Sequence, residues 1–181
     1  MTTYGGTLVV AWALLAACGD TTTATRTDLR AYLSRARSWA PTEAEENRAI
    51  ARILQTQFVD EAEVLHQIAA SRPRILAHLE RVRGYEPRTQ AIGRIHARYV
   101  AAWQHLLDGY AAIEQGFATG DYTGLARGRE AMEAWRAVIE SVAHELRDLA
   151  DHLGVDPAAV VESRVRPPPG HSEIHRTKSR A

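Results

Sequence analysis

Cysteine is nearly absent from this 181-residue chain, in which Cys18 is the only one. A single cysteine excludes an internal disulfide and a zinc site built from several cysteines. Lysine is equally scarce, since Lys178 is the only one and the other basic residues are arginine. Acidic and basic residues balance to a formal net charge of zero, without the basic excess typical of nucleic-acid binding. We therefore expect no nucleic-acid partner.

Signals for strands and for common catalytic sites are also missing. After residue 20 there are no long alternations of Val, Ile and Thr, so we expect no strands. The sequence has no P-loop, no glycine-rich dinucleotide motif, no His-Glu-x-x-His and no serine in a nucleophile elbow. It also lacks Cys-x-x-Cys-His, which excludes covalently attached c-type haem. No residue is assigned a catalytic role, and a non-catalytic function is favoured over an enzyme.

The most informative segment is an apolar run from Leu8 to Ala17 that ends at Cys18. The run is shorter than the roughly 20 residues that span a bilayer, and it has the length of a signal-peptide core. Its last residues, Leu15, Ala16, Ala17 and Cys18, resemble the lipobox of bacterial lipoproteins. The resemblance implies that residues 1–17 are a signal peptide and that Cys18 carries diacylglycerol and acyl lipid. The residues before the run depart from such signals, because they include no Lys or Arg.

The resemblance also implies a location. A lipidated Cys18 places the protein at the bacterial cell envelope, on the periplasmic side of a membrane. Gly19, rather than Asp, follows the cysteine, which slightly favours the outer membrane if the source is Gram-negative. Residues 18–26 are rich in Thr and are interpreted as a lipidated tether. The alternative is a buried N-terminal helix with an inert core cysteine.

Residues 27–163 predict a helical domain. A first helix is expected at about 27–39. Thr42 and Glu45 form a capping-box pattern that predicts the start of a second helix. This helix is expected to break near Pro73, and a shorter helix then runs to Gly84.

The strongest structural signal is a pair of long helices at about 89–119 and 121–153. Their apolar residues step by three and four, and Gly120 and Asp121 between them suit a tight turn. The fold class is therefore all-α, an up-and-down bundle of about four helices that contains a long antiparallel helical hairpin. Residues 164–181 contain three consecutive prolines and scattered basic residues, and they predict a disordered basic tail.

The candidate ligand-binding residues are His96, Tyr99 and Trp103, which share the apolar seam of the first long helix. A buried imidazole needs a hydrogen-bond partner or a ligand. Two other patterns have ligand spacing: a Glu63/His66 pair like those of di-iron bundles, and a row formed by His144, Asp148 and His152. Both are interpreted as solvated surface, and no metal site is assigned.

These observations favour a lipid-anchored envelope protein that acts as a non-catalytic binding or assembly module. Its expected partners are the membrane, through the lipid on Cys18, and an envelope protein. No cofactor is expected beyond that lipid. The alternative is a helical bundle that binds a metal, haem or small apolar ligand at the seam of His96, Tyr99 and Trp103.

Overall fold

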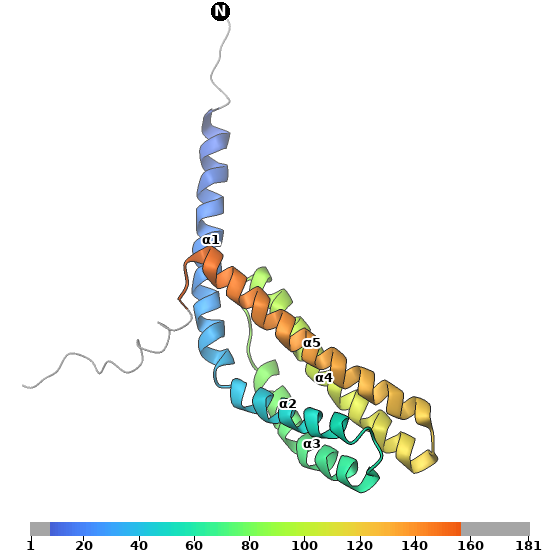
Figure 1. Ribbon diagram of the computed structural model, residues 1–181. Helices are drawn as coiled ribbons and strands as arrows, with labels where there is room; N and C mark the ends of the chain where they lie inside the picture. The colour runs from blue at the N-terminus through green and yellow to red at the C-terminus, as the bar shows by residue number, and fades with distance from the viewer. Residues whose placement is uncertain (1–7, 157–181) are drawn as a thin grey trace, which may run out of the picture.

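The computed structural model describes residues 8–156, with side chains from Thr21 onward. In this part of the chain there are five helices and no strand. The helices are α1 (Leu8–Ala36), α2 (Ala40–Gln55), α3 (Glu61–Arg83), α4 (Gln90–Thr119) and α5 (Tyr122–Leu153) (Figure 1). The predicted all-α bundle is confirmed.

The predicted antiparallel hairpin is formed by α4 and α5, which pack along their lengths (Figure 1). Gly120 ends α4 with φ of 70°, a left-handed conformation that glycine adopts without a steric penalty. Asp121 then caps α5, because its carboxylate accepts a hydrogen bond of 2.9 Å from the backbone N–H of Thr123. Both turn residues act as the sequence predicted.

Two glycines let the helices of this hairpin approach closely. A Cβ atom on Gly128 of α5 would lie 2.1 Å from Cγ1 of Ile113, and one on Gly109 of α4 would lie 2.4 Å from Cβ of Ala131. Such separations are far below van der Waals contact. The lack of a side chain at these two glycines therefore lets the backbones of α4 and α5 lie close together in the half of the hairpin nearer Gly120.

The predicted break near Pro73 is wrong. The chain instead turns at Thr56–Asp60, where Gln57 and Phe58 have φ of 50° and 61°. Asp60 caps α3 by accepting a 3.0 Å hydrogen bond from the N–H of Glu63. Pro73 lies exposed inside α3, whose buried side chains continue on both sides of it: Val64, Ile68, Ile75, Leu79 and Val82. Burial of this continuous face outweighs the one backbone hydrogen bond that proline removes.

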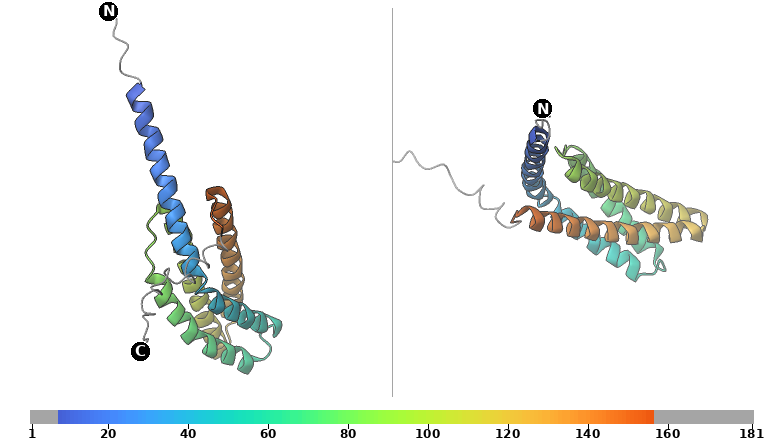
Figure 2. Two further views of the ribbon diagram at one scale, coloured as in Figure 1. Left: turned by 90° about the vertical axis from the view of Figure 1, so that its left-hand side faces the viewer. Right: turned by 90° about the horizontal axis from the view of Figure 1, so that it is seen from above.

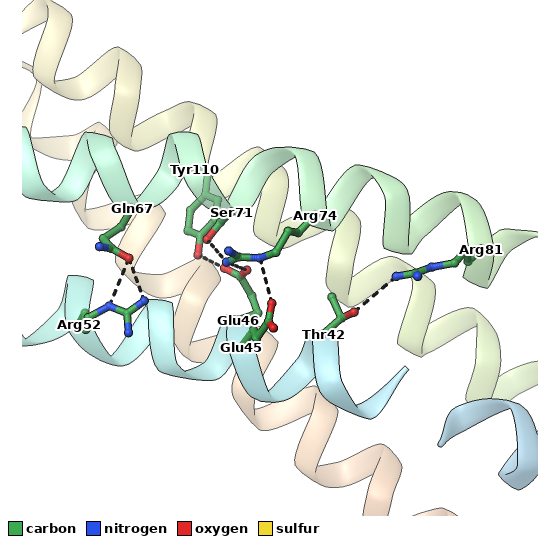
Figure 3. A network of polar contacts seen from close by, with 9 residues as sticks. All are labelled: Thr42, Glu45, Glu46, Arg52, Gln67, Ser71, Arg74, Arg81 and Tyr110. Carbon is green, nitrogen blue, oxygen red and sulfur yellow. Dashed lines mark hydrogen bonds and ion pairs between the residues drawn. The ribbon is translucent and has the colours of Figure 1, made fainter. Parts of the chain in front are cut away.

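The predicted capping box at Thr42 is also wrong. α2 begins at Ala40, its N-cap is Trp39, and Pro41 lies in the first turn, where its missing N–H costs nothing. Thr42 instead accepts a long hydrogen bond of 3.4 Å from Arg81 of α3 (Figure 3). The N-cap residue Trp39 is itself buried in the core and makes no side-chain cap hydrogen bond.

Helix α1 begins before the predicted start at Thr27 and includes the residues assigned to the tether. Arg26 donates a 2.8 Å hydrogen bond to the carbonyl of Leu153 at the end of α5. The buried carboxylate of Asp28 accepts hydrogen bonds from the N–H groups of Arg88 (2.9 Å) and Thr89 (2.8 Å). It caps α4 from another helix, since Thr89 provides no side-chain cap of its own.

The helices form two antiparallel pairs, α2 with α3 and α4 with α5, and α1 joins them at the end where α5 finishes (Figures 1 and 2). The N-terminal part of α1 projects away from these pairs (Figure 1). Within residues 8–156, no helix has the length and apolarity needed to cross a bilayer. The predicted tail at 164–181 lies outside the described residues.

Candidate binding groove

The three predicted ligand-binding residues lie buried on one face of α4, but their surroundings differ. Nδ1 of His96 lies 3.4 Å from the hydroxyl of Tyr32, and its ring also contacts the rings of Trp39 and Tyr85. Burial lowers the pKa of His96, which favours the neutral ring. His96 is thus enclosed by aromatic side chains and lines neither cavity described below.

Tyr99 connects the core to a surface groove. Its hydroxyl lies 2.6 Å from Oε1 of Glu43 and 2.9 Å from Nε2 of His78. Burial and the nearby Glu43 raise the pKa of Tyr99 far above its usual range, so the phenol keeps its proton and donates it to the carboxylate. His78 must then donate from Nε2 to the Tyr99 oxygen. A hydrogen-bond chain therefore leads from His78 through Tyr99 to Glu43.

Trp103 is fully buried and belongs to the core. Its ring centroid lies 4.3 Å from that of His78 and 4.9 Å from that of Trp135. The indole N–H groups of Trp103 and Trp135 have no hydrogen-bond partner within the described part of the chain. Of the three predicted residues, Tyr99 lines the first of the two cavities described next, and His96 and Trp103 line neither of them.

That cavity lies between the end of α1, the start of α2 and the middle of α5, and its volume is about 240 Å³. A second cavity of about 410 Å³ continues between α2 and α5. Both are lined by Ala40, Glu43, Ile139 and Ala143, so they form one groove, called the α2–α5 groove below. The first cavity is walled mainly by apolar and aromatic side chains: Tyr32, Leu33, Ala36, Trp39, Tyr99, Val142 and Leu146.

Glu43 is the charged group where the two cavities meet. Burial raises its pKa, and the hydrogen bond from Tyr99 opposes this shift. Glu43 forms no ion pair with any residue in the described part of the chain. Arg37 lines the first cavity, and Arg136 and Glu140 line the second. The groove thus combines apolar walls with one half-buried, unpaired carboxylate.

A second acidic residue of α2, Glu46, is fully buried but lines neither cavity of the groove. It accepts a hydrogen bond from Tyr110 of α4, and Oε2 lies 3.5 Å from Nη2 of Arg74 on α3 (Figure 3). Arg74 also pairs with Glu45 at 3.5 Å. Burial raises the pKa of Glu46, whereas Tyr110 and Arg74 act to lower it. Glu46 therefore joins three helices and has a structural role.

The sequence pattern around Glu46 indicates that this residue is buried, although the sequence analysis did not identify it. Glu46 stands four residues before Ile50 and seven before Ile53, which places a carboxylate on the apolar face of α2. Glu43 lies one turn earlier on that face. His78 occupies an equivalent position in α3, three residues after Ile75. An ionisable residue in an apolar stripe requires a partner, and here the partners come from α3 and α4.

The other patterns with ligand spacing lie at the surface. His66 is exposed, and Glu63 accepts a 2.7 Å hydrogen bond from Gln67. His144, Asp148 and His152 are all exposed on α5. Within the described residues no group of three His, Cys, Asp or Glu side chains is placed to hold a metal ion. The side chain of Cys18 lies outside the described part.

The chain matches no protein-family model, and comparisons with curated proteins and with solved structures found no similar protein. Its function must therefore be argued from the groove and from the sequence around Cys18.

Proposed function

We propose that this chain is a lipid-anchored, non-catalytic binding protein of the bacterial cell envelope, and that the α2–α5 groove is its binding site. The observation that carries the binding role is the groove itself, in which apolar walls surround the unpaired carboxylate of Glu43. Small-molecule sites commonly combine apolar lining with a few polar groups that orient the ligand. The two cavities that make up the groove are of a size suited to a small ligand or to a side chain of a partner protein.

The anchoring role rests on the lipobox-like sequence that ends at Cys18. Cys18 lies within the bounds of α1, eight residues before Arg26, which bonds to the end of α5. At about 1.5 Å per helical residue, this separation is roughly 12 Å. A lipid on Cys18 would therefore hold the bundle close to the membrane. Confinement to this layer would raise the local concentration of the groove for membrane components and envelope proteins.

The anchor is tested by replacing Cys18 with Ser in the native host. We expect the variant to move from the membrane fraction to the soluble fraction and to lose incorporation of labelled fatty acid. Gly19→Ser is the matched control, because it adds the same side chain beside an intact cysteine, and it should remain with the membrane. If Cys18→Ser stays in the membrane fraction, the lipid anchor is wrong.

The binding site is tested separately by native mass spectrometry of residues 20–181 purified from the same host. Extra mass should accompany the wild-type domain and disappear in Ala143→Trp, which fills the groove from an exposed position. His144→Trp is the control, since it adds the same ring at an exposed neighbour that does not line the groove. Extra mass that persists in Ala143→Trp would place the ligand elsewhere.

A further inference from the structure

We propose that the α2–α5 groove binds an amphipathic organic cation, an alkylammonium whose charged head lies against Glu43 and whose chain follows α5. This rests on the proposed function, because it names the ligand class of the same groove. The position of the Glu43 charge and the length of the apolar lining support it.

The carboxylate of Glu43 is available to a cation. The only side-chain hydrogen bond that it accepts in the described part of the chain comes from Tyr99, through Oε1. Arg37 lines the same cavity but makes no ion pair with Glu43. Arg136 and Glu140 are both exposed on α5 and offset each other. Among the charged residues that line the two cavities, Glu43 lines both, whereas Arg37 lines only the first and Arg136 and Glu140 only the second. The charge at the junction itself is therefore that of Glu43, which favours a cationic head group at this point of the groove.

Aromatic side chains give the groove a rigid wall beside Glu43. Tyr32, Trp39 and Tyr99 line the first cavity but are buried, and the rings of Trp39 and Tyr99 stack with centroids 5.5 Å apart. Their faces are packed against the core, so the electrostatic attraction for a cation comes from the Glu43 carboxylate.

The remaining lining suits an alkyl chain. Ile139, Val142 and Leu146 of α5 face the groove from Glu43 toward the end of α1. The first and last of them are seven positions apart along the helix, or roughly 10 Å. A short alkyl chain fits this length, whereas a small hydrophilic amine would leave the apolar wall uncovered.

The test is calorimetric titration of residues 20–181 at neutral pH with n-heptylammonium, n-heptanol and heptanoate. These probes share a chain and differ in head charge. We expect n-heptylammonium to bind at least about tenfold more tightly than n-heptanol, since unit charges about 4 Å apart near a protein surface attract strongly. Heptanoate should bind most weakly. Equal affinity of the three probes, or preference for heptanoate, would overturn the proposal.

Two variants assign the charge to Glu43. Glu43→Gln keeps the shape and should reduce n-heptylammonium affinity at least about tenfold, while n-heptanol affinity stays within about twofold. Glu140→Gln removes the same charge from an exposed position of the groove and should change both affinities less than about twofold. Ala143→Trp should weaken both ligands. Unchanged n-heptylammonium affinity in Glu43→Gln contradicts the proposal, as does absence of any n-heptylammonium binding.

The outcomes separate this inference from the proposed function. If n-heptanol and n-heptylammonium bind equally and Ala143→Trp removes both, the groove is a binding site but not a cation site. If no probe binds while native extra mass is still lost in Ala143→Trp, the binding role stands and the ligand class is wrong.

Discussion

Individual buried ionisable residues account for much of the specificity of this bundle. Glu46, His78 and Asp28 are all buried, and each bonds to an element other than its own. A buried carboxylate or imidazole without such partners would be strongly destabilising. These contacts therefore favour one arrangement of helices that would otherwise share only apolar faces.

Glu46 makes stability depend on pH. Because its pKa is raised in the folded state, the fold favours the protonated acid, and this stabilisation is lost as pH rises through the folded-state pKa. We expect the free energy of unfolding of Glu46→Gln, relative to that of the wild type, to increase from about pH 4 to about pH 8. This window begins near the ordinary pKa of a glutamate and extends upward, in the direction in which the pKa of Glu46 is shifted. Gln retains an acceptor for Tyr110, and Arg74 retains Glu45.

Urea unfolding at several pH values measures this difference. Tyr110, Arg74 and Ser71 face Glu46 and are present in both proteins, so the comparison isolates the group at position 46. His78 has its pKa lowered to about 4 and gives the opposite slope, which also cancels. A constant difference between Glu46→Gln and the wild type would show that Glu46 does not titrate in this way.

The sequence predicts which residues are buried, because burial follows from side-chain type and helical spacing. It does not predict which residue of another helix each of them contacts. The buried position of Tyr99 follows from helical spacing. Its contact with Glu43 does not, because it depends on how α2 packs against α4. Glu43 lies between Thr42 and Glu45, whose pattern predicts a capping box. That prediction considers only neighbours in the sequence, and the packing of α2 against α4 overrides it.

At the scale of elements, the close contact of α4 with α5 depends on glycine. Gly128→Ala places a Cβ atom 2.1 Å from Ile113 and 2.9 Å from the carbonyl oxygen of Gly109. We expect a loss of about 2 kcal/mol in the free energy of unfolding, because overpacking outweighs the gain in helix propensity. Chemical denaturation of both proteins measures this loss.

Gly93→Ala is the matched control in α4, since an added Cβ there meets nothing within 4 Å. It should stabilise the protein by about 0.5–1 kcal/mol, as alanine does in open helical positions. Equal effects of Gly128→Ala and Gly93→Ala would contradict the close approach of the two helices.

The α4–α5 hairpin could be predicted from sequence because its signals are local. Gly120 and Asp121 determine the turn through their own conformations, and the apolar steps run for whole helices. The break between α2 and α3 could not be predicted, because Gln57 and Phe58 are not residues typical of turns. Pro73 is a strong signal for a helix break, but the buried side chains on both sides of it keep α3 continuous.

At the scale of the whole molecule, two of the contacts that attach α1 are made with the ends of other helices. Asp28 caps α4, and Arg26 bonds to the end of α5. We expect Asp28→Ala to destabilise the protein by about 3 kcal/mol, because two backbone N–H groups lose a charged acceptor. Hydrogen exchange at Arg88 and Thr89 should accelerate in the variant.

Asp148→Ala removes an exposed carboxylate from α5 and should change stability by no more than about 0.5 kcal/mol. If Asp28→Ala behaves in the same way, α1 is not held by this cap. The sequence predicted neither contact, because each joins residues at least 60 positions apart.

For the molecule as a whole, we propose a bundle that carries a small-ligand groove and is held at the membrane through Cys18. The most direct test is an intact mass measurement of the protein extracted from membranes of its native host under native conditions. We predict a chain that begins at Cys18 and carries diacylglycerol and acyl lipid, with a further non-covalent mass that Ala143→Trp lacks. An unmodified chain that retains residues 1–17 would contradict the account.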